Sequence, residues 1–577
     1  MKTDPETPTR RERRTLLLLS AATALATLGL LLSTSPRLPM GWDEGNAIGR
    51  AEQIRQWTRS WVARAPGQPH PLSRRAIEQD WPYTTRVEGH PAFYGIVLAA
   101  GQGISGKWLP PLEGWRFGPM LLFSLAAGAL FHAIARQFGQ AAGLAAALAL
   151  LVQPRLFAHA HFALADALLA ACWVLAWAAF APPRPNWRRA VLFGLLLGMA
   201  MSTKAPGWFA PIPFILWAAL YRDGRAAAAL ALGLPVALAT FYLLNPPLWH
   251  EPLAGLATFV HLNTHRQINV AILFLGGMYD LHHALPWYNT LVWTAITVPA
   301  GLLALAVLGI LGVVRRGRAD RAGVLLILNW LILLVVRALP GTPPHDGIRL
   351  FLPSFAFLAG LAGLGAAQLL GRWTACPPPG PIALRANGRP RSARDTRQSL
   401  GGRHTEYLCV GYFRTAVVAL VFIGSAANLA WYAPQWLSYY NLLIGGLRGA
   451  AAAGMEPTYY WDALDGEVLG WLAAHTGGDE KVRFGSGSPE NLALMRAWGA
   501  LGVEYRPDAP GRYAWYVIQR RPSACLPPDQ WLLKNARPVY RKTLRQSGWG
   551  PWRLDVPLIE IYRYADFAAA REATRGG

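Results

Sequence analysis

The sequence of 577 residues is short of charge: only 15 % of its residues are charged, whereas 53 % are hydrophobic. A soluble globular domain carries about 25 % charged residues. The deficit extends over most of the first 435 positions. This composition excludes a disordered chain, a small disulfide scaffold and an ordinary cytosolic enzyme. It predicts a polytopic α-helical membrane protein.

Cysteine and lysine are also scarce. The four cysteines show no CxxC spacing, so neither a zinc site nor a disulfide framework is predicted. Arginine carries most of the net charge of +23, much of it in short runs beside apolar segments, at 10–14, 184–189, 222–225 and 315–321. This distribution is typical of the cytoplasmic loops of a membrane protein. We therefore expect no nucleic-acid partner.

Apolar runs predict eleven membrane spans. They lie at residues 15–34, 116–136, 140–157, 166–182, 190–205, 207–221, 226–247, 289–314, 322–339, 348–370 and 413–432. Threaded alternately, they place most of the arginine-rich loops on the cytoplasmic side. A further glycine-rich segment, 91–106, predicts a short or re-entrant helix, so the total is about 11–13 helices.

The spans imply a division of the chain into five parts. Residues 1–14 form a basic cytoplasmic N-terminus. Residues 15–371 form the transmembrane module, with outer loops 35–90 and 248–288. The Pro-, Gly- and Arg-rich segment 372–412 predicts a flexible cytoplasmic linker, and 413–433 is the last span. Residues 434–577 predict a small α/β domain outside the cytoplasm, with strands at 481–485, 512–519 and 558–564 and helices near 462–475 and 489–500.

Two adjacent carboxylates, Asp43 and Glu44, directly follow the first span. A carboxylate at a membrane surface is suited to act as a general base toward a hydroxyl group. The alternative is a helix N-cap, in which both carboxylates favour the positive end of a helix.

The same outer loop ends with Gly89, His90 and Pro91. A histidine at the mouth of a short membrane helix could contact a phosphate or a metal ion. The alternative is a turn with proline at the first helical position.

One arginine, two histidines and one aspartate cluster between two spans: Arg155, His159, His161 and Asp166. Arg155 and His159 are candidate substrate contacts. His159 and His161, together with His90, are weak candidates for a metal site, because residues i and i+2 of a helix point apart. Asp166 is a candidate catalytic residue, or else a simple helix cap.

Lys204 ends an apolar helix at the outer face. A compact ammonium group there suits a phosphate anion, and the alternative is a lysine that extends to the interface. The outer loops also carry Arg266, His345 and Arg349. These three could contact an anion or belong to ordinary hydrated loops.

Several motifs in order along the chain resemble one family. They are GWDE at 41–44, HPAFY at 90–94, PRLFAHAHFALAD at 154–166, GLLLGMAMSTKAP at 194–206 and HDGIRLFLPSFAFLAGLAGLG at 345–365. Together they resemble polyprenyl-phosphate-dependent glycosyltransferases of the membrane GT-C type, in the branch of the protein O-mannosyltransferases and aminoarabinose transferases (glycosyltransferase family 39). The resemblance covers roughly residues 15–370. The runs 439–446 and 456–462 are similar to the C-terminal region of some bacterial members.

The resemblance implies a GT-C fold and an inverting transfer from a polyprenyl-phosphate-linked sugar to a hydroxyl group. By similarity, Asp43 takes the acceptor proton, and Asp166 matches a second acidic position. Cations must then stabilise the polyprenyl phosphate that leaves; the candidates are His90, Lys204, Arg266 and Arg349. The resemblance implies Glu-Lys-Pro in the aminoarabinose branch at the position where this chain has Gly89-His90-Pro91. This difference puts a metal or phosphate role there in doubt.

The expected partners are the lipid-linked donor, membrane lipids and an acceptor that is a protein, a glycan or a lipid. The cofactor question stays open between none and a divalent metal. The arginine-rich composition suggests the inner membrane of a bacterium, with the site on the periplasmic face. Competing interpretations are a lipid-linked glycan ligase or polymerase, a transporter of a lipid or envelope precursor, and a non-catalytic scaffold. A transporter would favour ionisable groups at mid-bilayer and an internal repeat, and the sequence has neither feature.

Overall fold

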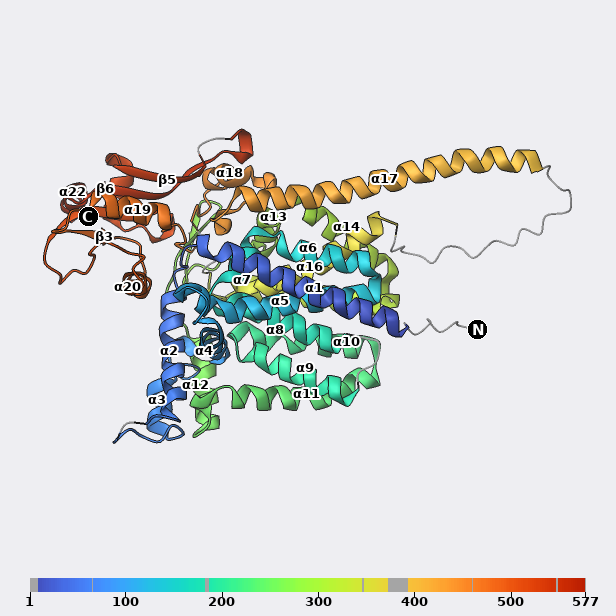
Figure 1. The fold of residues 1–577 in the computed structure, drawn as a ribbon, viewed down its shortest axis with the longest axis horizontal. Coiled ribbons are helices and arrows are strands. Elements are labelled where there is room, and N and C mark those ends of the chain that lie inside the picture. The colour runs from blue at the N-terminus through green and yellow to red at the C-terminus, as the bar shows by residue number, and fades with distance from the viewer. Residues whose placement is uncertain are drawn as a thin grey trace.

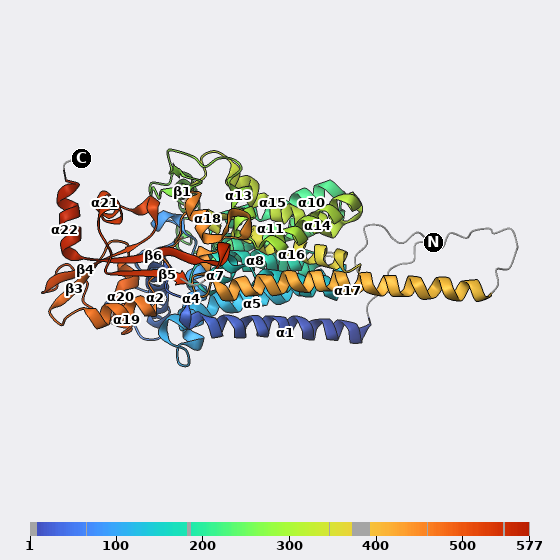
Figure 2. The same ribbon diagram turned by 90° about the horizontal axis from the view of Figure 1, so that it is seen from above.

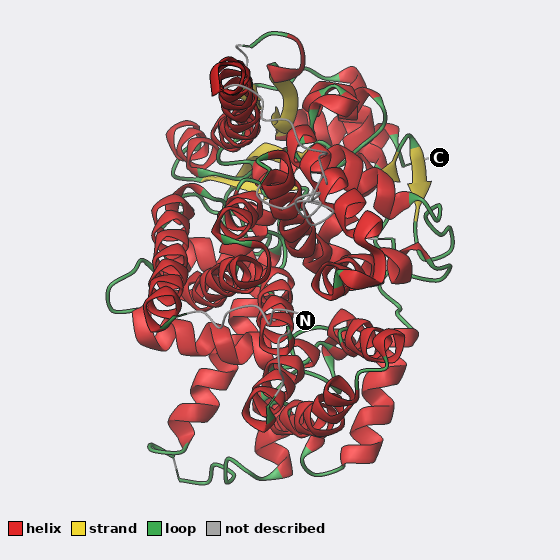
Figure 3. Ribbon diagram, turned by 90° about the vertical axis from the view of Figure 1, so that its right-hand side faces the viewer, coloured by secondary structure: helices red, strands yellow, loops and turns green. Residues whose placement is uncertain are grey.

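The structure is a computed structural model that describes residues 9–64, 66–181, 186–344, 347–371, 393–458, 460–545 and 548–575. A bundle of roughly parallel helices forms its body, and a smaller α/β domain caps the end of the bundle that lies away from the N-terminus (Figures 1 and 2). Figure 3 looks along the bundle from the N-terminal side, with most helices end-on. The polytopic helical fold with a C-terminal α/β domain is therefore confirmed.

Within the described residues, seven helices are long and apolar enough to cross a membrane. They are α1 (Arg10–Thr34), α5 (Pro111–Phe138), α11 (Gly224–Leu243), α14 (Ala300–Arg316), α15 (Arg321–Ala338), α16 (Leu352–Leu369) and the apolar part of α17 (Ala393–Trp431). Helix α16 is the central one, because 94 % of its most apolar window is buried inside the protein.

The other expected spans are shorter or broken. They comprise α4 (Phe93–Ser105), α6 (Gln140–Leu151), α7 (Pro154–His161), α8 (Ala165–Phe180), α9 (Trp187–Met201), α10 (Pro211–Tyr221) and α13 (Asn289–Thr297). The expected span over 140–157 is bent, since α6 and α7 meet at an angle of 73°. Proline has no backbone N–H and disfavours helix in the preceding residue, so the chain breaks before Pro154. The run 289–314 is likewise divided, before Pro299.

Close backbone approach joins α14 to α16. A Cβ atom at Gly309 would lie 2.0 Å from the carbonyl oxygen of Leu361, and one at Gly365 would lie 1.8 Å from that of Leu305. Small residues at such a contact let two membrane helices pack backbone against backbone. The long glycine-rich run in α16 is thus explained by helix packing.

The connections at the capped end of the bundle carry most of the extramembrane helices. Helices α2 (Glu44–Ser60), α3 (Arg74–Asp80) and α12 (Pro252–Thr264) run crosswise to the bundle there (Figure 1). A hairpin of β1 (Ile272–Phe274) and β2 (Gly277–Tyr279) follows α12. Short 3-10 turns complete these connections: η1 (Ser35–Arg37), η2 (Val87–Gly89), η3 (Ala205–Phe209), η4 (Pro246–Leu248) and η6 (Gly347–Phe351). A further turn, η5 (Gly317–Ala319), joins α14 to α15 at the other end.

The α/β domain contains one four-stranded sheet of order β3-β4-β6-β5. Its strands are β3 (Glu480–Phe484), β4 (Arg512–Gln519), β5 (Tyr540–Arg545) and β6 (Leu554–Arg563), with β3 parallel to β4 and the other pairs antiparallel. The helices of this part are α18 (Gly446–Ala452), α19 (Gly466–His475), α20 (Pro489–Ala497), α21 (Pro527–Asn535) and α22 (Tyr564–Ala573). Turns η7 (Trp436–Ser438), η8 (Leu442–Ile444), η9 (Pro522–Ala524) and η10 (Gly550–Trp552) connect them.

The expected flexible linker 372–412 needs a correction. Residues 372–392 lie outside the described part of the chain, but from Ala393 onward the backbone is helical and continues into the last span as α17. The segment 393–412 is therefore a helical extension of that span.

Candidate active site

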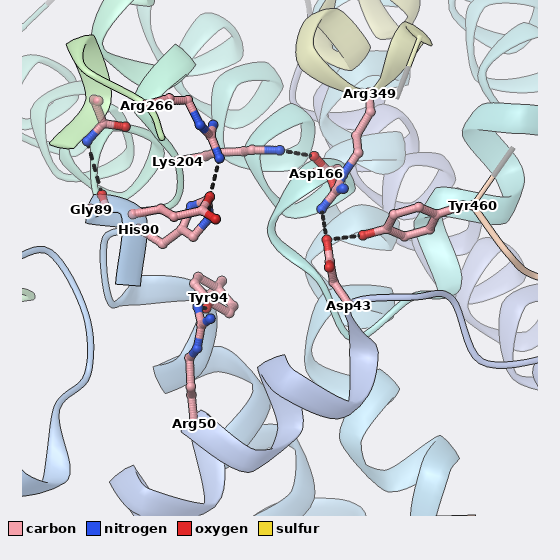
Figure 4. Close-up of polar contacts among 12 residues, drawn as sticks. Asp43, Arg50, Gly89, His90, Tyr94, Asp166, Lys204, Arg266, Arg349 and Tyr460 are labelled. Atoms are coloured by element: carbon pink, nitrogen blue, oxygen red, sulfur yellow. Dashed lines mark hydrogen bonds and ion pairs between the residues drawn. The ribbon is translucent and has the colours of Figure 1, made fainter. Parts of the chain in front are cut away.

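A network of ion pairs links four of the expected residues. Arg349 in η6 donates from Nη2 to Asp43 Oδ2 at 2.7 Å and from Nε to Asp166 Oδ2 at 2.7 Å. Lys204, directly after α9, donates to Asp166 Oδ1 at 2.5 Å. Asp166 is 2 % exposed and Lys204 6 %, so both lie inside the protein. Four distant segments thus meet at the capped end of the bundle (Figure 4).

Asp43 is the accessible carboxylate of this network, with 42 % of its side chain exposed. It occupies the N-cap position of α2, but its side chain makes no capping hydrogen bond. Instead, the carboxylate accepts hydrogen bonds from Arg349 and from the hydroxyl of Tyr460. The helix-cap alternative therefore describes the backbone position of Asp43 and leaves its side chain available for chemistry.

Glu44 points away from this network, which corrects its assignment as a substrate contact. Its side chain is fully buried and forms a two-point ion pair with Arg116, at 2.8 and 2.7 Å. It also accepts from the backbone N–H groups of Gly41 and Ala163. Arg116 in turn donates to backbone carbonyls of residues 35, 38 and 39. This pair holds the loop that presents Asp43.

A tight loop brings Glu88, His90 and Arg266 together. Val87 and Glu88 have positive φ angles of 46° and 59°, and Gly89 follows at 70°. Non-glycine residues rarely adopt this conformation, and such strain tends to occur at functional sites. The Arg266 guanidinium donates to the Glu88 carboxylate, and His90 Nε2 lies 3.6 Å from it.

Burial and neighbouring charges shift the pKa values of Glu88 and His90 in this loop. The adjacent His90 ring and then the Arg266 guanidinium lower the pKa of Glu88 to about 2, against the opposing effect of burial. Burial lowers the pKa of His90 below its ordinary value, more than Glu88 raises it. Glu88 is therefore ionised and His90 neutral at pH 7.

These residues surround a pocket of about 460 Å³. Arg50 and Tyr94, joined by a hydrogen bond of 3.2 Å, line this pocket, and so do Tyr460 and Trp461. Figure 4 shows Lys204, Arg266 and His90 on one side of this space and Asp43 with Tyr460 on the other. The remaining lining residues are Trp42, Asn46, Ala47, Val87, Glu88, Leu164, Ala165, Ile268, Val270, Arg349 and Leu350.

Arg155, His159 and His161 are not among the residues that line the pocket. Arg155 is 1 % exposed, donates to the carbonyl of Tyr439 and lies 4.3 Å over the ring of Tyr440. His161 interacts with Thr34 Oγ1 and stacks on Trp436. Arg155 and His161 therefore join α7 to its neighbours, which corrects Arg155 as a substrate contact.

His159 is buried behind the pocket, with its ring centroid 6.5 Å from that of Tyr460. It therefore borders the site without lining it. No group of three or more His, Cys, Asp or Glu side chains that could hold a metal ion occurs in the described parts of the chain. His90, His159 and His161 thus do not assemble into a metal site there. His345 lies outside the described residues.

Several residues that line the pocket were not among the candidates predicted from the sequence. Arg50 follows Asp43 by seven positions, so both lie on one face of α2. Glu88 lies only two residues before His90, but a loop conformation with positive φ cannot be inferred from that spacing. Tyr460 and Trp461 belong to the run 456–462, whose family resemblance assigned no role to either residue.

Comparison with known proteins finds a family match for part of the chain. Residues 90–250 match the family model of dolichyl-phosphate-mannose-protein mannosyltransferases. This match, together with the polytopic helical fold, indicates a membrane glycosyltransferase of the GT-C type. The matched segment contains His90, Asp166 and Lys204, whereas Asp43, Arg349 and Tyr460 lie outside it. No curated protein sequence matches the chain.

Solved structures with a similar arrangement come from bacteria and archaea. Apo ArnT from Cupriavidus metallidurans has a TM-score of 0.46 and 15 % identity, covering 97 % of this chain and 99 % of that one. The same protein bound to undecaprenyl phosphate gives 0.44 and 17 %, with 94 % and 97 % coverage. The oligosaccharyltransferase AglB from Archaeoglobus fulgidus, with an inhibitory peptide and a dolichol-phosphate, gives 0.45 and 12 %, with 88 % and 69 % coverage.

Proposed function

We propose that the glycosyltransferase moves a sugar from a polyprenyl-phosphate-linked donor to a hydroxyl acceptor, with inversion at the anomeric carbon. The main support for this proposal is the arrangement of charges in the pocket. An accessible carboxylate, Asp43, faces a group of cations across a space large enough for a sugar. The matched family description, which names a dolichyl-phosphate-linked mannose donor, supports a donor of this kind.

The charge of the pocket fits a phosphate ester. Four cationic side chains oppose three carboxylates, and His90 is neutral, so one positive charge is left over. The seven charged residues are Arg50, Lys204, Arg266, Arg349, Asp43, Glu88 and Asp166. A donor phosphodiester carries one negative charge, and the released phosphate monoester carries about −1.5 to −2 at pH 7. The excess cation therefore stabilises the leaving group more strongly than the donor, as catalysis requires.

We assign the general-base role to Asp43. The acceptor oxygen attacks the anomeric carbon as its proton moves to the Asp43 carboxylate. The bond between that carbon and the phosphate oxygen breaks, and the electron pair leaves with polyprenyl phosphate. Arg349 and Tyr460 hold the carboxylate in place, and Asp166 orients Arg349 and Lys204. We propose Lys204, Arg266, Arg349 and His90 as the phosphate contacts.

We further propose that the pocket opens on the outer face of a bacterial inner membrane. The turns that join α10 to α11 and α14 to α15 lie at the opposite end of the bundle (Figure 1) and are rich in arginine. Arginine-rich loops favour the cytoplasm. The N-terminus is then cytoplasmic, the α/β domain is periplasmic, and the prenyl chain of the donor stays among the helices and lipids.

The test is turnover by the purified protein in nanodiscs, with radiolabelled polyprenyl-phosphate monosaccharides and a cell-envelope extract as acceptor source. Release of free polyprenyl phosphate is the readout. We expect Asp43→Asn to lower the rate by roughly 10²- to 10⁴-fold, the usual contribution of a general base. Lys204→Ala should weaken donor use, and Asp508→Asn, on the exposed surface of the α/β domain, is the matched control.

Each outcome separates the competing assignments. Wild-type rates in Asp43→Asn would refute the base assignment and direct the same test to Asp166. Turnover only with pyrophosphate-linked glycans would identify a ligase or polymerase instead. Donor binding without any release of polyprenyl phosphate, followed by movement across the bilayer, would favour a transporter.

A further inference from the structure

Large exposed apolar side chains lie on or beside two turns, η8 and η10, which both pack against α18 next to the membrane bundle. They are Leu442, Leu443, Trp549 and Trp552, with exposed fractions of 48, 67, 81 and 41 %. We call these four residues the lower patch. A water-facing domain rarely gathers large apolar side chains in one exposed place unless something covers them.

Two segments distant in sequence build the lower patch together. Leu442 and Leu443 belong to η8, and Trp549 and Trp552 lie in or next to η10. Helix α18, which follows η8, packs against η10, and Gly446 comes so close that a Cβ there would lie 2.4 Å from the carbonyl oxygen of Pro551. The two segments therefore hold a fixed relation to each other.

Contacts with α17 place the lower patch at the membrane boundary. The apolar part of α17 ends at Trp431. The Trp431 indole donates to the carbonyl of Trp552 at 2.8 Å, and Arg545 donates to the carbonyl of Trp431 at 3.0 Å while stacking 4.5 Å over its ring. In Figures 1 and 2, α18 lies beside this end of α17.

The surroundings of the lower patch are cationic. Arg448 and Arg553 both approach Asp555, at 3.5 and 2.8 Å, and each is about half exposed. Two arginines share one carboxylate, so one positive charge remains beside the patch. Tryptophan at the depth of the headgroups with arginine beside it is the composition that favours a bilayer interface.

We propose that the lower patch inserts into the interfacial region of the bilayer leaflet next to the α/β domain, with Arg448 and Arg553 at the phosphate level. The occupant is a phospholipid surface, because the patch continues the boundary at which a membrane span ends. This anchor fixes the α/β domain, which supplies Tyr460 and Trp461 to the pocket, at a set height above the membrane. The proposal does not depend on the reaction that the pocket carries out.

The test places an environment-sensitive fluorescent amino acid at position 549 of the full-length protein in nanodiscs. Lipids with a quencher in the upper acyl chain should lower its emission by about twofold, as for a side chain 5–10 Å inside the interface. A probe at Leu443 should respond in the same way. A probe at Arg512, 77 % exposed at the outer end of β4, is the control and should respond only to aqueous iodide.

Two outcomes would overturn the proposal. Emission at 549 and 443 that iodide quenches as strongly as at 512 would show that the patch faces water. Protection from both iodide and lipid quencher would show that protein covers it, either a partner or a second copy of this chain.

Discussion

Asp43 and Glu44 are neighbours in sequence, but their side chains lie in opposite environments. Glu44 is fully buried against Arg116, whereas Asp43 faces the pocket. Sequence analysis treated both as candidates, because two adjacent carboxylates at a helix start look alike. Their difference depends on Arg116, which lies 72 residues further along the chain.

Replacing Glu44 should damage folding, whereas replacing Asp43 should damage only chemistry. Glu44→Gln leaves the buried Arg116 without its counter-charge, a loss of about 3–5 kcal/mol for a buried pair. We expect low yield and an early thermal transition, measured by fluorescence-detected gel filtration after heating. Asp43→Asn, the matched carboxylate-to-amide change, should leave the thermal transition close to that of the wild type. Equal thermal stability of the two variants would contradict the structural role of Glu44.

Tyr460 should hold Asp43 in the orientation that catalysis needs. The Tyr460 hydroxyl donates to the carboxylate, and a base acts efficiently only when it is held in the correct geometry. Tyr460→Phe keeps the ring beneath Arg349, whose Cζ lies 4.5 Å from the ring centroid, but removes that bond. We expect kcat to fall by about tenfold, the effect of one hydrogen bond, with little change in the KM for the donor, as measured by release of polyprenyl phosphate.

The control for this effect is Tyr513→Phe, in β4 of the α/β domain, which should keep the wild-type rate. A wild-type kcat in Tyr460→Phe, or a rise in KM alone, would contradict the positioning role of Tyr460. Asp43→Asn measured in parallel separates an error about Tyr460 from an error about the base.

At the scale of helices and strands, apolar runs located the membrane segments well. The physical reason is that lipid-facing helices must be apolar along their length. The bends before Pro154 and Pro299 were missed because a continuous apolar run conceals a break in the backbone. Strand β5 was missed because it lies at the edge of the sheet, where its sequence YRKTLR lacks the apolar alternation of a central strand.

The contact between α14 and α16 should tolerate no side chain at its glycines. Gly365→Val places atoms against the carbonyl of Leu305, which a Cβ alone would approach to 1.8 Å. Overpacking of this kind costs about 1–3 kcal/mol or more, so the thermal transition should fall by several degrees. Gly424→Val in α17 is the matched control, because no atom lies within 4 Å of a Cβ there. Equal transitions for both variants would contradict the packing described.

For the whole molecule, the sequence predicted the class of fold and the end of the bundle at which polar groups gather. It could not predict which of them meet. Lys204, Asp166, Arg349 and Asp43 form one network only because four segments converge, and no spacing in the chain encodes that convergence. Arg155 and His161 are also polar residues next to membrane spans, yet they lie in the packing between helices.

Stability of the whole protein should depend on pH through Asp462, which follows the pocket residues Tyr460 and Trp461. Its side chain is fully buried, and burial raises its pKa to about 6. Because the folded pKa exceeds the unfolded value of about 3.9, the stabilising effect of protonation is present below pH 4 and is lost as the pH rises through 6. The shift corresponds to about 3 kcal/mol.

Asp462→Asn should therefore raise the thermal transition at pH 8 relative to the wild type and change it little at pH 4. Differential scanning fluorimetry in detergent across this range gives the comparison, with the exposed Asp508→Asn as control. A variant that is less stable than the wild type at pH 8 would show that the ionised carboxylate has a stabilising partner.

The hydrogen bond between Asp43 and Tyr460 joins positions 417 residues apart. During synthesis the ribosome delivers Asp43 with the first span and Tyr460 only after the last one. The support of Glu44 by Arg116 forms early, but the proposed base gains its second hydrogen-bond donor when translation is nearly complete. A chain that stalls before the α/β domain would thus have its membrane helices inserted and packed. It would still lack the Tyr460 hydroxyl that donates to the Asp43 carboxylate.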